Sequence, residues 1–215
     1  MPRVRVGQLE AAIAGLDREA INTLLASETI DDHVLRAALT IKRLAGEVNV
    51  LVHALGILLS LKHILEPDEI LMAVSLGAGT GGRRYDLETD RRIAEFKFTR
   101  WRGHDAVRQN ELFADFVYLA ESADSRRRQL FVAGLTLPRK FLTNSKRSLA
   151  SVCQRRPDVL ARIKLGDGMT FQTVSEYTAA RFERVELVDL EHILPAYLVD
   201  QVQLAASASP RADEL

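Results

Sequence analysis

The chain has 215 residues, enough for one well-buried domain, and 47% hydrophobic with 27% charged residues is the composition of an ordinary globular protein. Lys plus Arg and Asp plus Glu both total 29, so the formal net charge is zero, which excludes a generally cationic coat but not a local basic groove. The single cysteine, Cys153, excludes an internal disulfide and a cysteine-based zinc site, and it predicts a reducing, cytoplasmic location.

The first elements that we expect are helical. Helical spacing over residues 7–27 predicts an N-terminal helical extension, residues 1–30. Asp31 and Asp32 then provide an N-cap for a long helix that ends near Leu65. The second half of this helix is apolar on nearly every side, which suits a helix buried against a sheet.

The length of the apolar part of this helix decides whether it can span a membrane. The run over residues 48–61 is interrupted by Asn49, His53 and Ser60, and it is too short to span a bilayer. The start of the chain lacks the apolar core and cleavage site of a secretory signal. We therefore expect no membrane partner, and we interpret His53 as a packed or surface histidine rather than a ligand.

The period of the pattern changes after the long helix. Residues 70–76 predict a short apolar strand, and residues 83–98 alternate polar and apolar side chains as a hairpin does. Residues 103–120 return to helical spacing, with Val107, Leu112, Phe116 and Leu119 as expected buried positions. The later predicted elements are a strand over 129–135, helices over 138–153 and 157–164, a strand over 184–190 and a closing helix over 191–202.

The order of these elements is helix, three strands, helix, strand and further helices, with no linker or repeat between them. It predicts one α/β domain of the α+β kind over residues 31–202, built on a mixed sheet flanked by helices. Residues 203–215 are small and polar and predict a flexible tail.

A glycine-rich segment offers one interpretation of function. Gly77, Gly79 and Gly82 fit G-x-G-x-x-G, the pattern that cradles a dinucleotide pyrophosphate. That site requires a helix directly after the glycines, whereas residues 83–90 alternate at period two, as a strand does. We therefore interpret the glycines as a connection between two strands.

The hairpin offers a second interpretation. With its turn at Asp90 and Arg91, Asp86 lies opposite Glu95 and Arg84 opposite Lys97, all on one face. The other face then carries the core residues Tyr85, Leu87, Ala94, Phe96 and Phe98.

Two facing carboxylates repel each other unless a cation lies between them, and Mg²⁺ favours carboxylate oxygens, water and phosphate. Asp86 and Glu95 therefore predict a Mg²⁺ or Mn²⁺ site, with Lys97 on the same side of the strand. Such a metal activates water for phosphodiester hydrolysis, and the lysine orients that water or offsets developing negative charge. The alternative is an exposed hairpin face of mixed charge.

Asp86 and the Glu95-Phe96-Lys97 triplet, placed within helix, three strands, helix and strand, resemble the PD-(D/E)xK nuclease superfamily over residues 35–136. The resemblance implies a restriction-endonuclease-like core with extra N- and C-terminal helices. It implies a metal-dependent endonuclease acting on DNA in restriction, defence or repair. The metal would be held by Asp86, Glu95 and the backbone carbonyl of Phe96, with Lys97 in catalysis. Tyr85 replaces the proline that often precedes the aspartate in that family.

The resemblance also implies supporting residues. Glu47 on the first core helix would complete the metal site, the alternative being a residue at the exposed end of the helix. Gln109 or Arg108 would position the lysine or hold the substrate backbone, the alternative being a solvated helix face. Trp101 would stack on a base, or else pack at the end of a strand.

Arginines near the hairpin predict contact with a polyanion, because a guanidinium binds phosphate through a planar fork. The candidate nucleic-acid-binding residues are Arg84, Arg100, Trp101, Arg102 and Arg108. Cutting both strands of a duplex with one site per chain would favour a homodimer. The alternative function is a non-catalytic module of the same fold that binds nucleic acid or a partner.

Overall fold

The computed structural model describes residues 12–13, 17–77, 85–101, 103, 105–165 and 170–194. Asp17 caps a helix near the start of the described chain. Its carboxylate accepts a hydrogen bond from Ala20 N–H at 2.9 Å, at the start of α2 (Arg18–Ser27). The long helix α3 (Asp32–Ile64) follows, and both of its ends lie within one residue of the predicted ones, Asp31 or Asp32 at the start and Leu65 at the end. Gly79, Gly82, Arg84, Arg102 and the segment 195–215 lie outside the described residues.

The chain divides into two compact units, residues 1–49 and 50–215. The division lies within α3 and not after residue 30, where the sequence placed the end of an N-terminal extension. The reason is that α3 is continuous, and its contacts with the core of the second unit involve residues from Val52 onward.

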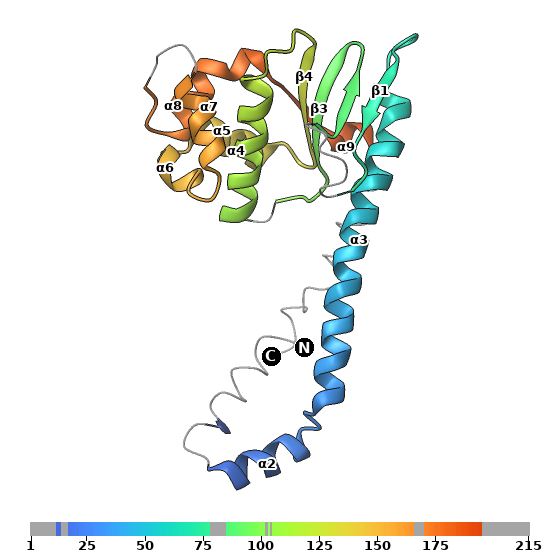
Figure 1. Ribbon diagram of the computed structural model, residues 1–215, viewed down its shortest axis with the longest axis vertical. Helices are drawn as coiled ribbons and strands as arrows, with labels where there is room; N and C mark the ends of the chain where they lie inside the picture. Colours follow the sequence, from blue (N-terminus) through green and yellow to red (C-terminus); the bar gives the residue numbers. More distant parts are fainter. Residues whose placement is uncertain are drawn as a thin grey trace, which may run out of the picture. The chain divides into compact units, whose positions relative to one another are not determined.

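A mixed sheet forms the centre of the second unit (Figure 1). Its described strands lie in chain order, and the antiparallel hairpin and short first strand that the sequence predicted are confirmed. The third, fourth and fifth strands run parallel. The fold is therefore α+β with a mixed sheet flanked by helices. The strands are β1 (Leu71–Val74), β2 (Leu87–Thr89), β3 (Arg92–Lys97), β4 (Arg127–Val132) and β5 (Glu186–Asp189).

Helices cover both faces of the sheet (Figure 1). On one face the second half of α3 and α9 (Leu190–Ile193) pack against Phe96 and Phe131. On the other face α4 (Ala106–Ala120) packs against Ile93, Leu130 and Val132, together with the later helices. Those helices are α5 (Thr136–Asn144), α6 (Leu149–Val152), α7 (Pro157–Leu165) and α8 (Val174–Arg181), the last followed by a 3-10 turn, Phe182–Arg184.

Three expectations about these elements are corrected. Val107 is 63% exposed, because it belongs to the first turn of α4, before the helix reaches the core. Tyr85 packs on the face of the sheet that α4 covers, not with Leu87 and Phe96 on the other face, because it precedes β2 and does not follow the pleat. Its hydroxyl donates a hydrogen bond to Ser122 Oγ at 2.9 Å. Helix α8 was missed, although Thr173 and Glu176 form a capping box at its start.

The prediction that the second half of α3 packs against the sheet is confirmed, but the expectation that this half is buried as a whole is wrong. Gly56, Ile57 and Ser60 are buried, whereas Leu51, on the opposite side of the helix, is 56% exposed. The sheet covers one stripe of the helix and leaves apolar side chains on the other. The segment Leu35–Ile64 is also long and apolar enough to cross a membrane by length and composition, contrary to the expectation from residues 48–61.

Candidate active site

The register of the β2–β3 hairpin is the one that the sequence predicted. Leu87 pairs with Ala94 and Glu88 with Ile93. Continuing this register by one position places Asp86 opposite Glu95, at the end of the hairpin away from its turn. Asp86 Oδ2 accepts a hydrogen bond from Phe96 N–H at 2.9 Å, which fixes the carboxylate against β3.

Five side chains meet at this point, and we refer to them as the acidic cluster. They come from the second half of α3, the start of β2, the end of β3 and the middle of α4. All belong to the second compact unit. The members of the acidic cluster are His53, Asp86, Glu95, Lys97 and Asp115.

Asp86 is held as an ionised carboxylate. Burial by itself would raise its pKa, but hydrogen bonds from His53, the Phe96 N–H and Glu95 favour the charged form and lower the pKa. The His53 Nε2 atom lies 3.3 Å from Asp86 Oδ1, and the His53 ring packs edge-on against Phe98. His53 is therefore packed, as expected, but it also contacts the predicted metal ligand.

Glu95 is in the opposite state. Burial, followed by the nearby charges of Asp115 and Asp86, raises the pKa of Glu95 to about 10. Glu95 therefore favours its protonated form, and as a carboxylic acid it can donate a hydrogen bond to the ionised Asp86. The cluster therefore contains more carboxylates than its own positive groups neutralise.

Lys97 contacts a carboxylate that the sequence analysis missed. Its Nζ atom lies 2.5 Å from Asp115 Oδ2. Burial by itself would lower the pKa of Lys97, but Asp115 more than offsets this and raises it. A signal was present in the sequence, because Asp115 lies among the apolar residues of ELFADFVYLA, where an unpaired carboxylate is costly to bury.

The supporting candidates Glu47 and Gln109 have partners outside the acidic cluster. Glu47 belongs to the first compact unit, where its exposed side chain forms an ion pair with Arg43 at 3.1 Å. Gln109 Oε1 accepts a hydrogen bond from Arg147 at 2.8 Å, whereas the α4 residue that contacts Lys97 is Asp115. The roles predicted for Glu47, Gln109 and the Phe96 carbonyl stay predictions.

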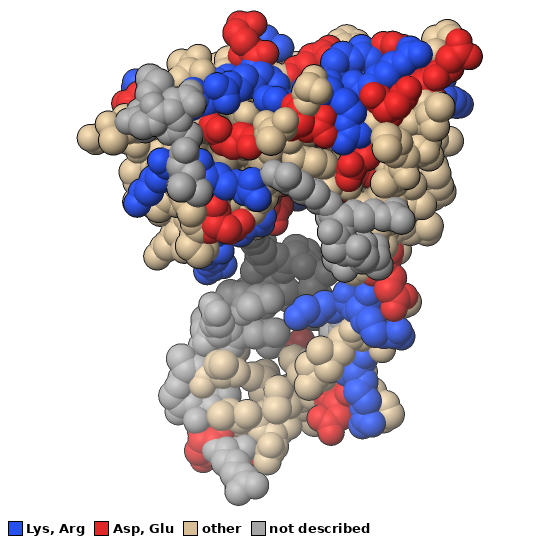
Figure 2. Space-filling view, turned by 45° about the horizontal axis from the view of Figure 1, so that its top comes forward, with Lys and Arg blue, Asp and Glu red and all other residues tan. Residues whose placement is uncertain are grey.

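The candidate nucleic-acid-binding residues also have partners within the chain. Arg100 pairs with Glu191 at 3.1 Å, and Arg108 pairs with Asp105, the N-cap of α4. Trp101 is 6% exposed and packs near Phe141, as the packing alternative predicted. On the surface drawn in Figure 2, Lys and Arg side chains lie among Asp and Glu side chains.

Several arginines of the hairpin and of β4 form ion pairs with glutamates of the same chain. Arg92 is buried and pairs with Glu69, while Arg91 and Arg127 pair with Glu66. Arg92 begins β3 and faces Arg127 in β4, so this network lies at the strand ends opposite Lys97, about 16 Å along β3. The expectation of a basic excess around the metal site is wrong for these arginines.

The donor set of the acidic cluster fits a divalent cation of the Mg²⁺ type. Mg²⁺ needs only one or two carboxylates when water and substrate phosphate complete its ligands. Asp86 supplies one, and Glu95 beside it would supply a second on losing its proton when the cation binds. Within the described ranges, no three His, Cys, Asp or Glu side chains already have the spacing of a complete metal-binding group.

Comparison of the chain with protein-family models, curated proteins and solved structures gives no match.

Proposed function

We propose that this protein is a metal-dependent nuclease that hydrolyses phosphodiester bonds, with a restriction-endonuclease-like core and DNA as its substrate. The observation that carries the proposal is the convergence of Asp86, Glu95 and Lys97 at one end of the β2–β3 hairpin. The order of α3, three strands, α4 and β4 around these residues supports the proposed core. We also propose a cytoplasmic location.

In this proposal Asp86 and Glu95 hold Mg²⁺ or Mn²⁺. The metal supplies a Lewis acid for the phosphoryl oxygen and lowers the pKa of an attacking water. Asp86 is oriented for this role by the Phe96 N–H and by His53. A carboxylate fixed by two partners in the free protein needs little rearrangement when its ligand binds.

Lys97 keeps an ammonium group beside the two carboxylates. Asp115 fixes Nζ from the α4 side, and the raised pKa of Lys97 means that it stays protonated at neutral pH. In that state it donates hydrogen bonds to a phosphate oxygen and offsets developing negative charge. Asp115 is therefore a positioning residue for Lys97 in the proposed site.

We also propose that the active form is a homodimer joined through α3. Exposed apolar residues recur on this helix at alternating spacings of three and four, a heptad pattern with Ile, Val and Leu in turn at the a positions and Leu at every d position. That pattern is typical of parallel two-stranded coiled coils. The residues are Ile41, Leu44, Val48, Leu51, Leu55 and Leu58.

A lipid environment for α3 is disfavoured by its other side chains. Arg43 and Glu47 lie within the segment Leu35–Ile64, and ionised groups are costly in a bilayer core. Ile57 is fully buried in the cluster on the sheet. A second copy of α3 covers the exposed stripe without disturbing either feature.

The test of function is a cleavage assay on supercoiled plasmid, linear duplex, single-stranded DNA and RNA, with Mg²⁺, Mn²⁺ or a chelator. We expect metal-dependent cutting of DNA by the wild-type protein and a loss of at least about 100-fold in Asp86→Ala and Lys97→Ala. The matched control is Glu88→Gln, which changes a carboxylate of the same hairpin that pairs with Arg126 outside the acidic cluster.

The outcomes separate the two candidate functions. Cutting that survives chelation, or that is unchanged in Asp86→Ala, contradicts the proposal. Tight binding of nucleic acid with chelator present, and no cutting of any substrate with either metal, would favour the non-catalytic binding module.

A further inference from the structure

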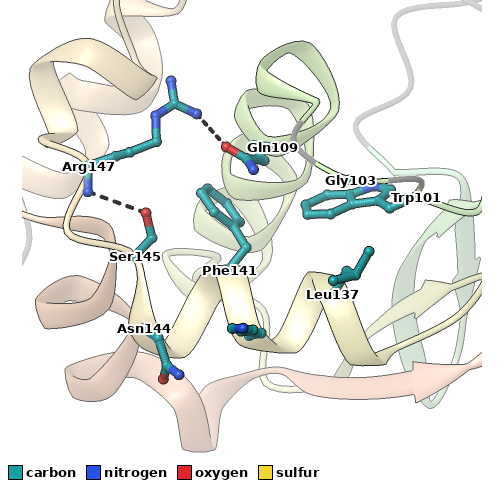
Figure 3. A pocket seen from close by; sticks show the side chains of 9 residues that line it. Trp101, Gly103, Gln109, Leu137, Phe141, Asn144, Ser145 and Arg147 are labelled. Carbon is teal, nitrogen blue, oxygen red and sulfur yellow. Dashed lines mark hydrogen bonds between the residues drawn. The ribbon is translucent and has the colours of Figure 1, made fainter.

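A cavity of about 380 Å³ opens beside the start of α4, between that helix, α5 and the segment that follows α5 (Figure 3). Its volume is within the range of about 300–1,000 Å³ that small-molecule sites occupy. The acidic cluster does not use any residue of its lining. The cavity therefore needs an explanation of its own.

One wall of the cavity is apolar and rigid. Trp101, Leu137 and Phe141 form it, and the Trp101 and Phe141 ring centroids lie 5.8 Å apart. Both aromatic side chains are almost fully buried in the core cluster around α4, so they are held in place. Each ring leaves only a small part of its surface open to the cavity, and this fixed apolar wall favours a planar ligand that packs against it.

The remaining lining is polar and cationic. Arg147 donates a hydrogen bond to Gln109 Oε1 at 2.8 Å (Figure 3). Among the described residues, no other side-chain hydrogen bond engages the Gln109 amide NH₂ or the remaining guanidinium N–H groups, so these donors can serve a ligand. Asn144 and Lys140 lie on the same cavity. Side-chain amides match the edges of nucleobases, and guanidinium and ammonium groups match phosphate.

The cavity is also close to the acidic cluster along the chain. Trp101 follows Lys97 by four residues, and Gln109 lies on α4 about 9 Å along the helix axis from Asp115. A polynucleotide with one phosphodiester at the acidic cluster can therefore place a nearby nucleotide in the cavity. A base reaches such a cavity only when it is unpaired or turned out of a duplex.

We propose that this cavity binds a single unstacked nucleotide, with its base against Trp101 and Phe141 and its phosphate at Arg147 and Lys140. The proposal rests on the proposed function, because it takes the nucleic acid as ligand. It makes the substrate one that presents an unpaired or extruded base next to the cleaved bond, as a single-stranded segment does.

The chain provides its own probe, because Trp101 is its single tryptophan. The full-length protein is titrated in chelator with each deoxynucleoside 5′-monophosphate, and Trp101 fluorescence is recorded with correction for absorption by the nucleotide. We expect saturable quenching by nucleotides, with inorganic phosphate and ribose 5-phosphate at least about ten-fold weaker because they lack a base to stack. Equal affinity for phosphate alone would identify an anion site and overturn the proposal.

Substitutions locate the site within the cavity. Arg147→Ala should weaken nucleotide binding about ten-fold or more, since it removes a charge-assisted contact with phosphate. Asn144→Ala, on an exposed position of α5, should change the preference among the bases with a smaller loss of affinity. The control Lys146→Ala removes one positive charge next to Arg147 but outside the cavity lining, and it should bind like the wild type.

Failure of this proposal is distinguishable from failure of the nuclease proposal. Lys97→Ala should lose cleavage and keep the nucleotide-dependent quenching, because Lys97 lies outside the cavity lining. Cleavage by wild-type protein without any quenching overturns the nucleotide cavity alone. Quenching without cleavage of any substrate overturns the nuclease alone and leaves a nucleotide-binding cavity.

Discussion

Asp115 Oδ2 lies 2.5 Å from Lys97 Nζ, and this contact joins the middle of α4 to the end of β3 inside the acidic cluster. The Lys97 side chain is 30% exposed and the Asp115 side chain 13%, and the ionised Asp86 adds its charge to the same site. Lys97 is therefore positioned from outside the hairpin that carries it.

The first prediction concerns this contact. Asp115→Asn should lower the rate of metal-dependent cleavage at least about ten-fold, because Nζ loses the charge that orients it. The combined loss in Asp115→Asn with Lys97→Ala should be far smaller than the sum of the single losses, since both changes break one interaction. Additive losses would show that Asp115 acts independently of Lys97. The control is Glu111→Gln, which removes an exposed carboxylate from the same helix.

A second prediction concerns the approach of α3 to the sheet. A Cβ atom on Gly56 would lie 2.4 Å from Phe98 Cε1, and the Phe98 ring is stacked on Phe96. Gly56→Ala should therefore lower the free energy of unfolding by about 1–3 kcal/mol through overpacking. Measurement is by urea denaturation of both the wild type and the variant.

Gly46 on the same helix is the matched control, because a Cβ atom there meets nothing within 4 Å. Gly46→Ala should leave stability unchanged or raise it by up to about 1 kcal/mol through helix propensity. Equal effects of the two substitutions would show that helix propensity, and not the contact with Phe98, decides the outcome.

A third prediction concerns pH. Burial by itself would raise the pKa of Glu69, but hydrogen bonds from Arg92, the Glu66 N–H and Thr89 lower it from 4.5 to about 2. A lowered pKa contributes stability that is complete above pH 4.5 and is lost as the pH falls toward 2. Glu69→Gln should therefore lower the free energy of unfolding at pH 7 by about 3 kcal/mol, with the difference from wild type shrinking across that interval.

Unfolding in denaturant, repeated from pH 7 down to pH 2, measures this effect. Glu66→Gln is the comparison, because Glu66 is exposed and pairs with the partly exposed Arg91 and Arg127, so its loss should be smaller. A Glu69→Gln deficit that stays constant with pH would mean that packing, and not the ion pair with Arg92, stabilises this site.

A fourth prediction concerns the exposed stripe of α3. Replacing Leu51 and Leu55 together by Glu should convert the proposed dimer to a monomer, because like charges would then face each other across the helix pair. Sedimentation velocity measures the change. Val107→Glu, which introduces the same charge at an exposed apolar position of α4, should keep the wild-type mass. A wild-type protein that is monomeric at every concentration contradicts the proposed dimer.

The hairpin could be read from the sequence because its period of two, together with its turn residues, leaves one register that buries Leu87, Ala94 and Phe96. The start of α3 followed from its N-cap residues in the same way. These are local signals, in which the residues that decide the structure are close together in the chain.

Asp115 and His53 could not be placed by such signals. Each lies on a helix far from the hairpin in sequence, and the rotation of that helix about its axis depends on packing with the sheet. The roles of Arg92 and Arg127 were missed for the same reason, because their partners Glu66 and Glu69 come from the loop between α3 and β1. The apolar composition of α3 likewise did not indicate which stripe of the helix packs against the sheet and which stays exposed.

The contributions of α3, the hairpin and α4 to the acidic cluster also have a temporal consequence. A polypeptide emerging from the ribosome has made Asp86, Glu95 and Lys97 before Asp115 exists, so until then the lysine lacks the carboxylate that fixes it. Assembly of the cluster therefore waits for the synthesis of α4, and a nascent chain that ends before α4 has the motif without the site.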